Sequence, residues 1–531
     1  MKKNRVFSLV TVALIVTTFC VDAQKLPYIT VNREGVKQLI VDEKPFIFLS
    51  GELHNSTASN LRYLSPRMKD LKERYLNSVI ATVSWELFEP REGEYDYALV
   101  KGIIDQAREN DMKLILIWFG TWKNTWSTYA PEWVKTNIKR FPRMQIKNGI
   151  NSGALSAFGE NTRKADAKAF AELMRYIREY DAKEQTVLMM QVENETGLLG
   201  TSRDRSNIAE AAFKEQVPVT LIEYLKQNKL NLTSEMKNML QLTGNKLTGT
   251  WREVFGYGAD EVFSAWYVSQ YVEDIILAGK AEYAIPMYVN AWLDGSFSKD
   301  LVPNYPSGGP VSKMFDVWRA GAPSIDLYGA DVYLDDFKKV CDQYTQQGNP
   351  LFLPELAPSV RQAAYVYYAL GRNAMCFAPF AVDGFNSETA AVVARSYQSL
   401  KGFLPFFSQH CGKDRNIGLL YTGREEEICQ LGNYRIQVHY NQQRNENEYR
   451  SESGGLILQT DKDEFFICGF GMQLSFYPVS EKSDMQIEFL LHEEGSFDDG
   501  VWHSERRMNG DELSIRMMTP SIRKVKFHIY K

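Results

Sequence analysis

One stretch constrains this chain more than any other: residues 187–197, which read Val-Leu-Met-Met-Gln-Val-Glu-Asn-Glu-Thr-Gly. It begins as an apolar run too short for a helix, which is typical of a strand buried on both faces in a parallel sheet. It then presents Glu193, Asn194 and Glu195 in succession. Polar side chains at the end of a buried strand are costly unless they face a solvated cavity. The stretch therefore predicts a strand that ends in a functional site.

The same pattern, a short apolar run followed by an amphipathic helical stretch, recurs along the first 400 residues. Such alternation predicts parallel strands joined by crossover helices. Besides the stretch above, strands are expected at 46–51, 78–84, 114–119, 286–289, 325–328, 351–355 and 374–377. We therefore predict an α/β fold, a (β/α)8 TIM barrel over residues 24–400, in which the strand ends form the active-site face.

Three segments fall outside this rhythm. Residues 28–41 predict a hairpin that turns at 32–35 and plugs or flanks the barrel bottom. Residues 198–283 are helical in pattern and too long for a barrel connection, so we expect an insertion that roofs the active-site face. Residues 412–531 predict a C-terminal antiparallel β-sandwich, because short alternating runs are separated by Asn, Asp, Gly and Ser. These runs lie at 434–438, 455–459, 464–468, 473–477, 486–491 and 525–530.

The N-terminus has the features of a signal peptide, expected over residues 1–23. Basic residues in the first five positions precede an apolar run over 6–19, and small residues near 21–23 suit cleavage. The run is shorter than a membrane span, so no stable span is expected. Export to the periplasm or the medium follows. Cys20 leaves a cell-surface lipoprotein as the alternative, although the bulky Phe19 before it disfavours lipidation.

Charge and cysteine usage exclude several classes of protein. A net charge of −5 with mixed signs provides no basic surface for nucleic acid. Five cysteines follow the leader without CxxC spacing, which predicts neither a zinc site nor a dense disulfide framework and leaves one bridge among the last three open. The six histidines are scattered, and only His54 is near a predicted strand end. We expect no metal and no other cofactor; homo-oligomer formation stays open.

A second apolar strand, 351–355, ends in Glu355. Cleavage of a glycosidic bond needs two carboxyl groups, one to protonate the departing oxygen and one to attack or to activate water. Their environments must differ so that one group keeps its proton while the other is ionised. Glu195 and Glu355 are at the ends of the fourth and seventh predicted strands, so we predict that they form such a pair. Glu193 is expected to support the site, and Asn194 to contact a sugar hydroxyl.

The segment 191–195, Gln-Val-Glu-Asn-Glu, resembles the signature of glycoside hydrolase family 35, the β-galactosidases of the large retaining (β/α)8 clan. Residues 51–54 and 85–97 resemble its first-strand and second-strand segments, and the similarity spans roughly residues 40–385. The resemblance implies that Glu195 is the general acid/base, that Glu355 is the nucleophile and that Asn194 contacts the 2-hydroxyl. The C-terminal sandwich resembles the extra domain of a bacterial branch that trims galactose from plant polysaccharides.

The sugar-binding residues depart from that family. Its third strand usually ends in Ala-Glu, which binds galactose hydroxyls, whereas this chain has Gly-Thr-Trp-Lys-Asn at 120–124. Positions 86, 88 and 196 also differ. We expect substitute contacts from the residues near the other strand ends, with the tryptophans serving as a stacking platform or as rim packing. These expected substrate-binding residues are Asn194, His54, Trp122, Lys123, Asn124, Trp292 and Tyr333.

Three functions compete on these grounds. The leading one is an exported, retaining exo-glycosidase, a β-galactosidase that removes terminal β-linked galactose from oligo- or polysaccharides. The second keeps this chemistry on another sugar or linkage, as in a β-xylosidase or an endo-galactanase. The third is a non-catalytic glycan-binding protein, against which the presence of both carboxyls argues. All enzyme hypotheses require Glu195 and Glu355 to be within about 10 Å of each other.

Overall fold

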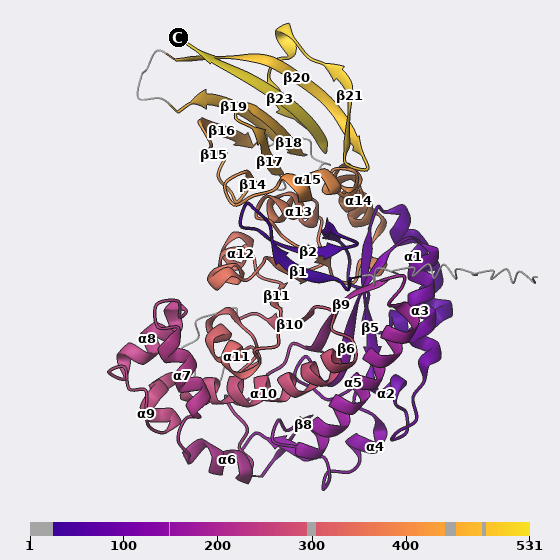
Figure 1. Cartoon of the computed structure of the whole chain (residues 1–531), viewed down its shortest axis with the longest axis vertical. Coiled ribbons are helices and arrows are strands. Elements are labelled where there is room, and N and C mark those ends of the chain that lie inside the picture. Colours follow the sequence, from indigo (N-terminus) through magenta and orange to yellow (C-terminus); the bar gives the residue numbers. More distant parts are fainter. Residues whose placement is uncertain (1–24, 148, 295–303, 441–452, 480–484) are drawn as a thin grey trace, which may run out of the picture.

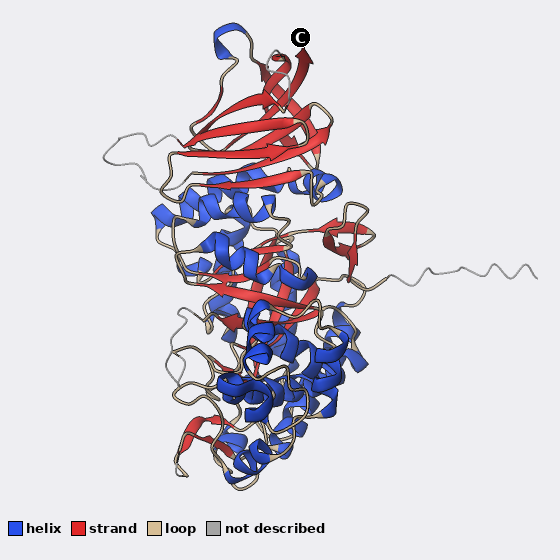
Figure 2. Cartoon of the chain, turned by 90° about the vertical axis from the view of Figure 1, so that its left-hand side faces the viewer, coloured by secondary structure: helices blue, strands red, loops and turns tan. Residues whose placement is uncertain are grey.

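A computed structural model describes residues 25–147, 149–294, 304–440, 453–479 and 485–531. The predicted signal peptide lies outside these residues. The body of the molecule is a ring of helices around parallel strands, and the C-terminal strands lie over one end of it, above α13 to α15 (Figures 1 and 2).

Eight parallel strands form the central sheet, in the order β4-β13-β12-β11-β10-β9-β6-β5. They are β4 (Phe48–Leu49), β5 (Ser78–Ser84), β6 (Lys113–Lys123), β9 (Val187–Asn194), β10 (Met287–Trp292), β11 (Leu327–Val332), β12 (Phe352–Leu356) and β13 (Cys376–Pro379). The sheet closes between β4 and β5, where Ile80 donates to the Gly51 carbonyl at 2.9 Å and Leu53 donates to the Ile80 carbonyl at 3.0 Å. The TIM-barrel prediction is confirmed.

One crossover helix follows each strand. These helices are α1 (Leu61–Glu73), α3 (Tyr97–Glu109), α5 (Glu160–Asp181), α10 (Ala259–Glu282), α11 (Phe315–Gly321), α12 (Phe337–Tyr344), α13 (Gln362–Gly371) and α14 (Ser387–Lys401). In α5 the buried residues Phe170, Leu173, Met174 and Ile177 recur at helical spacing, so one face packs inward. In contrast α10 is buried on most sides, because it packs against α5, α11 and β9.

The helical insertion after the fourth strand is shorter than the predicted range 198–283. Its helices are α6 (Asn207–Lys214), α7 (Val219–Gln227), α8 (Ser234–Leu242) and α9 (Trp251–Phe255). They pack on the outer ring, where α7 contacts α11 and α9 contacts α10. The last part of the predicted range is α10, which is a crossover helix of the barrel. Helical periodicity is the same for a crossover helix and an inserted one, so the sequence pattern could not separate them.

The predicted N-terminal hairpin is confirmed as β1 (Tyr28–Val31) and β2 (Lys37–Val41), to which β3 (Lys44–Phe46) adds a third strand. Leu39 and Val41 join barrel residues such as Phe48 and Ile115 in one apolar cluster. The hairpin therefore packs against the barrel interior. The first barrel strand is shorter than the predicted 46–51, because Phe46 pairs within the hairpin sheet instead.

Short elements complete the barrel domain: α2 (Trp85–Phe88), α4 (Glu132–Lys135), α15 (Leu404–His410), and the two-stranded sheet of β7 (Arg143–Gln145) and β8 (Asn151–Leu155). Among the described residues, no helix is both long and apolar enough for a membrane crossing.

The C-terminal strands form two antiparallel sheets, ordered β14-β17-β18-β23-β20-β21 and β15-β16-β19-β22. Their bounds are β14 (Asn416–Leu420), β15 (Glu426–Leu431), β16 (Tyr434–Tyr440), β17 (Gly454–Asp461), β18 (Glu464–Phe470), β19 (Met472–Pro478), β20 (Gln486–Asp498), β21 (Val501–Arg507), β22 (Ile515–Met517) and β23 (Ser521–Tyr530). All six predicted strands are present. Aromatic and aliphatic residues of both sheets, including Tyr434, Ile436, Phe465 and Phe527, share one core.

The C-terminal sheets pack on α13 through very close backbones. A Cβ on Gly371 would lie 2.3 Å from the Cα of Gly418, so glycine at both positions allows this approach. The five described cysteines, Cys341, Cys376, Cys411, Cys429 and Cys468, are all free. The bridge left open among the last three is therefore not formed, and these residues pack as small apolar groups instead.

Candidate active site

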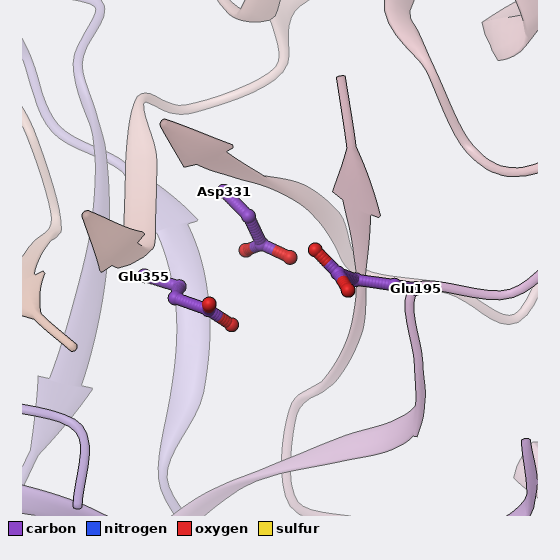
Figure 3. A group of neighbouring side chains, drawn as sticks. All are labelled: Glu195, Asp331 and Glu355. Carbon is purple, nitrogen blue, oxygen red and sulfur yellow. The ribbon is translucent and has the colours of Figure 1, made fainter. Parts of the chain in front are cut away.

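Three carboxyl groups meet at the C-terminal ends of the barrel strands. Glu195 directly follows β9, Asp331 is on β11 and Glu355 is on β12; the three side chains point toward one another (Figure 3). One carboxyl oxygen from each is within 4.8 Å of the other two. All three are buried, with 4, 1 and 4% of their surface exposed. Glu195 and Glu355 therefore face each other in one buried cluster, well inside the 10 Å that the glycosidase hypothesis requires.

The end of β9 has an unusual backbone. Glu193 and Glu195 have φ angles of 62° and 45°, in the left-handed region that non-glycine residues seldom adopt. Asn290 of β10 stabilises this turn, since its Oδ1 accepts from the backbone N–H of Glu195 at 3.0 Å and its Nδ2 donates to Asp331 Oδ2 at 2.7 Å. Local strain of this kind persists only where its surroundings hold it, and it often marks a functional site.

Glu193 supports the neighbouring strand end, as expected. Its two oxygens accept from the backbone N–H groups of Thr121 and Trp122, at 3.0 and 2.6 Å. Asp166 of α5 accepts from the Thr121 hydroxyl at 2.7 Å and from the Trp118 indole at 2.8 Å. Burial and then the charge of Asp166 hold the pKa of Glu193 well above its usual value. Glu193 of β9 thus holds the end of β6, and Asp166 holds the same segment from α5.

Burial and mutual charge perturb the carboxyls of this cluster. Burial, followed by the charge of Glu355, raises the pKa of Glu195 to about 7, while Lys123 opposes this rise. Burial and then the charges of Glu355 and Glu195 hold the pKa of Asp331 well above its usual value. The hydroxyl of Tyr333 donates to Glu355 Oε1 and so fixes the position of that carboxyl.

Several expected binding residues are close to this group. Asn194 is fully buried, and within the described part of the chain neither polar atom of its side chain has a hydrogen-bond partner. Lys123 is 7% exposed, and its ammonium is 5.1 Å from the centre of the Phe119 ring. Asn124, with a φ of 50°, donates its backbone N–H to the Asn194 carbonyl at 3.2 Å. Tyr333 is half-exposed beside Glu355.

The remaining expected residues are placed differently. Trp122 is 3% exposed, its indole donates to the Leu155 carbonyl at 3.2 Å, and its ring packs on Tyr271. Its ring is thus part of the packing and does not offer an open stacking face. Trp292 is 38% exposed at the end of β10. His54 is at the rim, where Asp383 holds both its backbone N–H and its ring.

Glu52, Asp331 and Asn290 were not among the residues predicted for the site. All three are at strand ends, which was the available signal. Glu52 follows β4, is 1% exposed, and interacts electrostatically with Glu355, Lys123 and Glu195. Each of them is followed or preceded by an apolar residue: Leu53, Val332 and Ala291. A single polar residue beside an apolar one is a weaker sequence signal than the three polar residues at 193–195.

The trio of Glu195, Asp331 and Glu355 is also spaced so that three oxygens could ligate a cation. Metal ligation needs deprotonated carboxyls. The raised pKa values of Glu195 and Asp331 come from burial and from the neighbouring carboxyls. The arrangement is suited to proton transfer.

A (β/α)8 barrel with two close carboxyls at the ends of its fourth and seventh strands defines the class: an enzyme that hydrolyses glycosidic bonds. Residues 59–234 match the family Glyco_hydro_42, described as Beta-galactosidase. This segment of the chain is thus similar to a family of β-galactosidases. The expected resemblance to family 35 is supported only at the level of a barrel glycosidase, because the matching family is a different one. Residues 393–519 match a domain of unknown function, DUF5597.

Solved β-galactosidase structures are similar to the chain at low identity. The enzyme from Rahnella sp. R3 is 14% identical, with a TM-score of 0.45 over 66% of this chain and 55% of that one. The enzyme Gan42B from G. stearothermophilus is 16% identical, with a TM-score of 0.46 over 68% and 57% of the two chains. The enzyme from Bacillus circulans sp. alkalophilus is 14% identical, with a TM-score of 0.46 over 67% and 57%. The chain thus spans less than two thirds of their lengths. No curated protein matches it.

Proposed function

We propose that this protein is an exported, retaining exo-β-galactosidase, in which Glu195 is the general acid/base and Glu355 is the nucleophile. The observation that carries the proposal is the pair of carboxyl oxygens within 4.8 Å of each other in one buried cluster. Retaining glycosidases hold their carboxyls about 5–5.5 Å apart, whereas inverting enzymes need about 6.5–9.5 Å to admit a water. The close spacing favours direct attack by a carboxylate.

In the first step, ionised Glu355 attacks the anomeric carbon while Glu195 donates its proton to the departing glycosidic oxygen. The bond between these two atoms breaks, an ester forms between the sugar and Glu355, and the aglycone leaves as an alcohol. The pKa of about 7 allows Glu195 to carry this proton near neutral pH. The hydroxyl of Tyr333 holds Glu355 by its Oε1, so that the other oxygen is the one available for attack.

In the second step, Glu195 removes a proton from water, which attacks the anomeric carbon and displaces Glu355 as a carboxylate. Formation of the ester removes the negative charge of Glu355, the second cause of the raised pKa of Glu195. The pKa of Glu195 therefore falls in the intermediate, and the same residue changes from acid to base. Two inversions at one carbon leave the released sugar with its original configuration.

The finer parts of the proposal have separate support. Galactose is favoured by the description of the family that matches residues 59–234. Exo action is supported by the burial of both carboxyls, because a chain end reaches buried groups more readily than the middle of a polymer does. Export is supported by the N-terminal sequence, with its basic residues, apolar run and small-residue cleavage site.

The test is hydrolysis of a panel of nitrophenyl glycosides, with galactoside and xyloside as the main contrast. We expect turnover of the β-galactoside, a β-anomer as the first product in a proton NMR time course, and loss of at least about 100-fold in kcat for Glu355→Gln. Faster turnover of the xyloside would show that the enzyme prefers xylose to galactose. An α-anomer as the first product would overturn the retaining mechanism. The mass of the mature chain after expression with its leader tests export.

A further inference from the structure

Glu52 is a buried carboxyl whose hydrogen bonds are missing. It comes shortly after β4 and bridges Ile80 of β5. It is 1% exposed, and neither of its carboxyl oxygens has a hydrogen-bond partner among the described residues. Burying a carboxyl without partners is among the costliest arrangements available to a fold. The mechanism above gives Glu52 no role. A group retained at this cost needs a partner that arrives from outside the chain.

The surroundings of Glu52 place it near the reacting carboxyls. It interacts electrostatically with Glu355, Glu195 and Lys123, whose strands lie around the barrel mouth. It also acts on Asp331 and Tyr333, and from the inner side on Tyr288 and Cys376. The latter two belong to the apolar cluster of the barrel interior. Glu52 is therefore within electrostatic range of both this interior layer and the reacting carboxyls.

Further unpartnered polar atoms are found in the same cluster. They comprise both polar atoms of the Asn194 side chain and one oxygen each of Glu195, Asp331 and Glu355. These belong to the ends of three other strands, and each residue is buried. A sugar ring carries several hydroxyls, and each can donate and accept a hydrogen bond. Such hydroxyls would supply the partners that these atoms lack.

We propose that Glu52 is a substrate-binding residue that hydrogen-bonds a hydroxyl of the sugar ring bound above Glu355, and that it helps to select neutral sugars. This inference rests on the proposed glycosidase function and deepens it. A ring hydroxyl donates to one carboxyl oxygen of Glu52 or accepts from its protonated form, so the buried carboxyl gains in the complex the bonds it lacks in the free enzyme. A sugar with its own carboxylate would instead bring an ionised group into this buried cluster of carboxyls, where burial of a charge is costly.

The protonation of Glu52 is consistent with this role. Burial first, and then the charge of Glu355, hold the pKa of Glu52 well above its usual value, while Lys123 opposes this shift. A neutral carboxyl both donates and accepts, as a bound hydroxyl requires.

The experiment is a coupling cycle between Glu52 and each ring hydroxyl. The kcat/KM values of the wild type and of Glu52→Met are measured on aryl β-galactosides that lack the 2-, 3-, 4- or 6-hydroxyl in turn. We expect one deletion to cost the wild type on the order of 100-fold and the variant less than about 3-fold, because the hydrogen bond is already gone. Equal penalties in both enzymes for every hydroxyl would overturn the inference and leave the glycosidase function intact.

Wild-type enzyme that turns over no glycoside of the panel would instead overturn the proposed function, and this inference with it. Glu52→Gln keeps the shape, one donor group and one acceptor, so we expect it to lose less than the methionine variant; an equal loss would point to a purely electrostatic role. If Glu52→Met does not fold, the same kcat/KM comparison across the deoxy substrates is made with Glu52→Gln, and its result decides whether Glu52 binds a ring hydroxyl. An aryl β-galacturonide is expected to react at least about 100-fold more slowly than the galactoside in the wild type; equal rates would refute the selection of neutral sugars.

A matched control separates binding from fold stability. Glu89 is another buried carboxyl near a strand end, but its oxygens accept from the Trp85 indole and from the Gly93 N–H, both at 2.7 Å. Glu89→Gln should lower the melting temperature, because its amide N–H group faces a donor. Glu52→Met should raise it, because an unpartnered carboxyl is removed. A marked fall in the melting temperature of Glu52→Met would show that the carboxyl serves the fold instead.

Discussion

The pKa of Glu195 provides the sharpest test of the proposed chemistry. Burial and the charge of Glu355 raise it from 4.5 to about 7. A rise of this size corresponds to roughly 3 kcal/mol in favour of the neutral acid. With a pKa near 7, about ten molecules carry the proton for each one that lacks it at pH 6, and about one in eleven carries it at pH 8. The enzyme should therefore lose its acid above neutral pH.

The assay is the pH dependence of kcat/KM for two substrates that differ in leaving group. For phenyl β-galactoside, whose leaving group needs protonation, we expect an alkaline limb with an apparent pKa near 7. Glu195→Gln should lower kcat/KM for this substrate by about 100- to 10,000-fold and abolish the limb. For a dinitrophenyl galactoside, which departs without a proton, the same variant should lose much less in kcat/KM.

Two further variants test the causes of this pKa. Lys123 lowers the pKa of Glu195, so Lys123→Met should move the alkaline limb to higher pH. Glu355 raises it, so in Glu355→Gln a carbon-13 NMR titration of Glu195 should yield a lower pKa than in the wild type. A limb that already falls near pH 4.5, or shifts in the opposite direction in both variants, would refute the electrostatic reasoning. Because Glu195 interacts with Asp331, the apparent values belong to the coupled group.

Four other perturbations have defined outcomes. Glu355→Gly should be inactive. Added azide should enter the vacated space and restore turnover of a dinitrophenyl galactoside, with an α-galactosyl azide as the product. A β-galactosyl azide would contradict the role of Glu355. Tyr333→Phe removes a hydrogen bond to Glu355 and should lower kcat by about 10- to 100-fold with an unchanged melting temperature; unchanged kcat would show that the bond is dispensable. Gly120→Ala places a Cβ 2.6 Å from Glu193 Oε1 and should destabilise the fold by about 1–3 kcal/mol in urea titration. The melting temperature should fall as pH rises from about 4.5 through 7, because the folded state holds protons on Glu195 that the unfolded state releases, and Glu195→Gln should reduce this slope.

Much of the fold was predictable because the barrel repeats one local pattern. Strand β5 was predicted with its observed bounds, and all the C-terminal strands that were predicted are present. The errors have local causes. Strand β11 begins two residues later than expected and continues to Val332, because the apolar run before it includes Ile325 in the preceding turn. The additional strands β14, β15, β21 and β22 are short, exposed on one side or polar, so their alternation was weak.

The sequence by itself determined which residues stand at the ends of buried strands, since apolar runs that end in Glu193–Glu195 or in Glu355 are a local property of the chain. It also determined the succession of barrel and antiparallel strands. Only the tertiary structure decided which strand ends meet. Ring closure brings Glu52, Asp331 and Asn290 beside the predicted pair. It also buries the ring of Trp122 against Tyr271, so that Trp122 serves packing. The physical reason is that proximity across a barrel depends on strand order and tilt, which no residue records in its own neighbourhood.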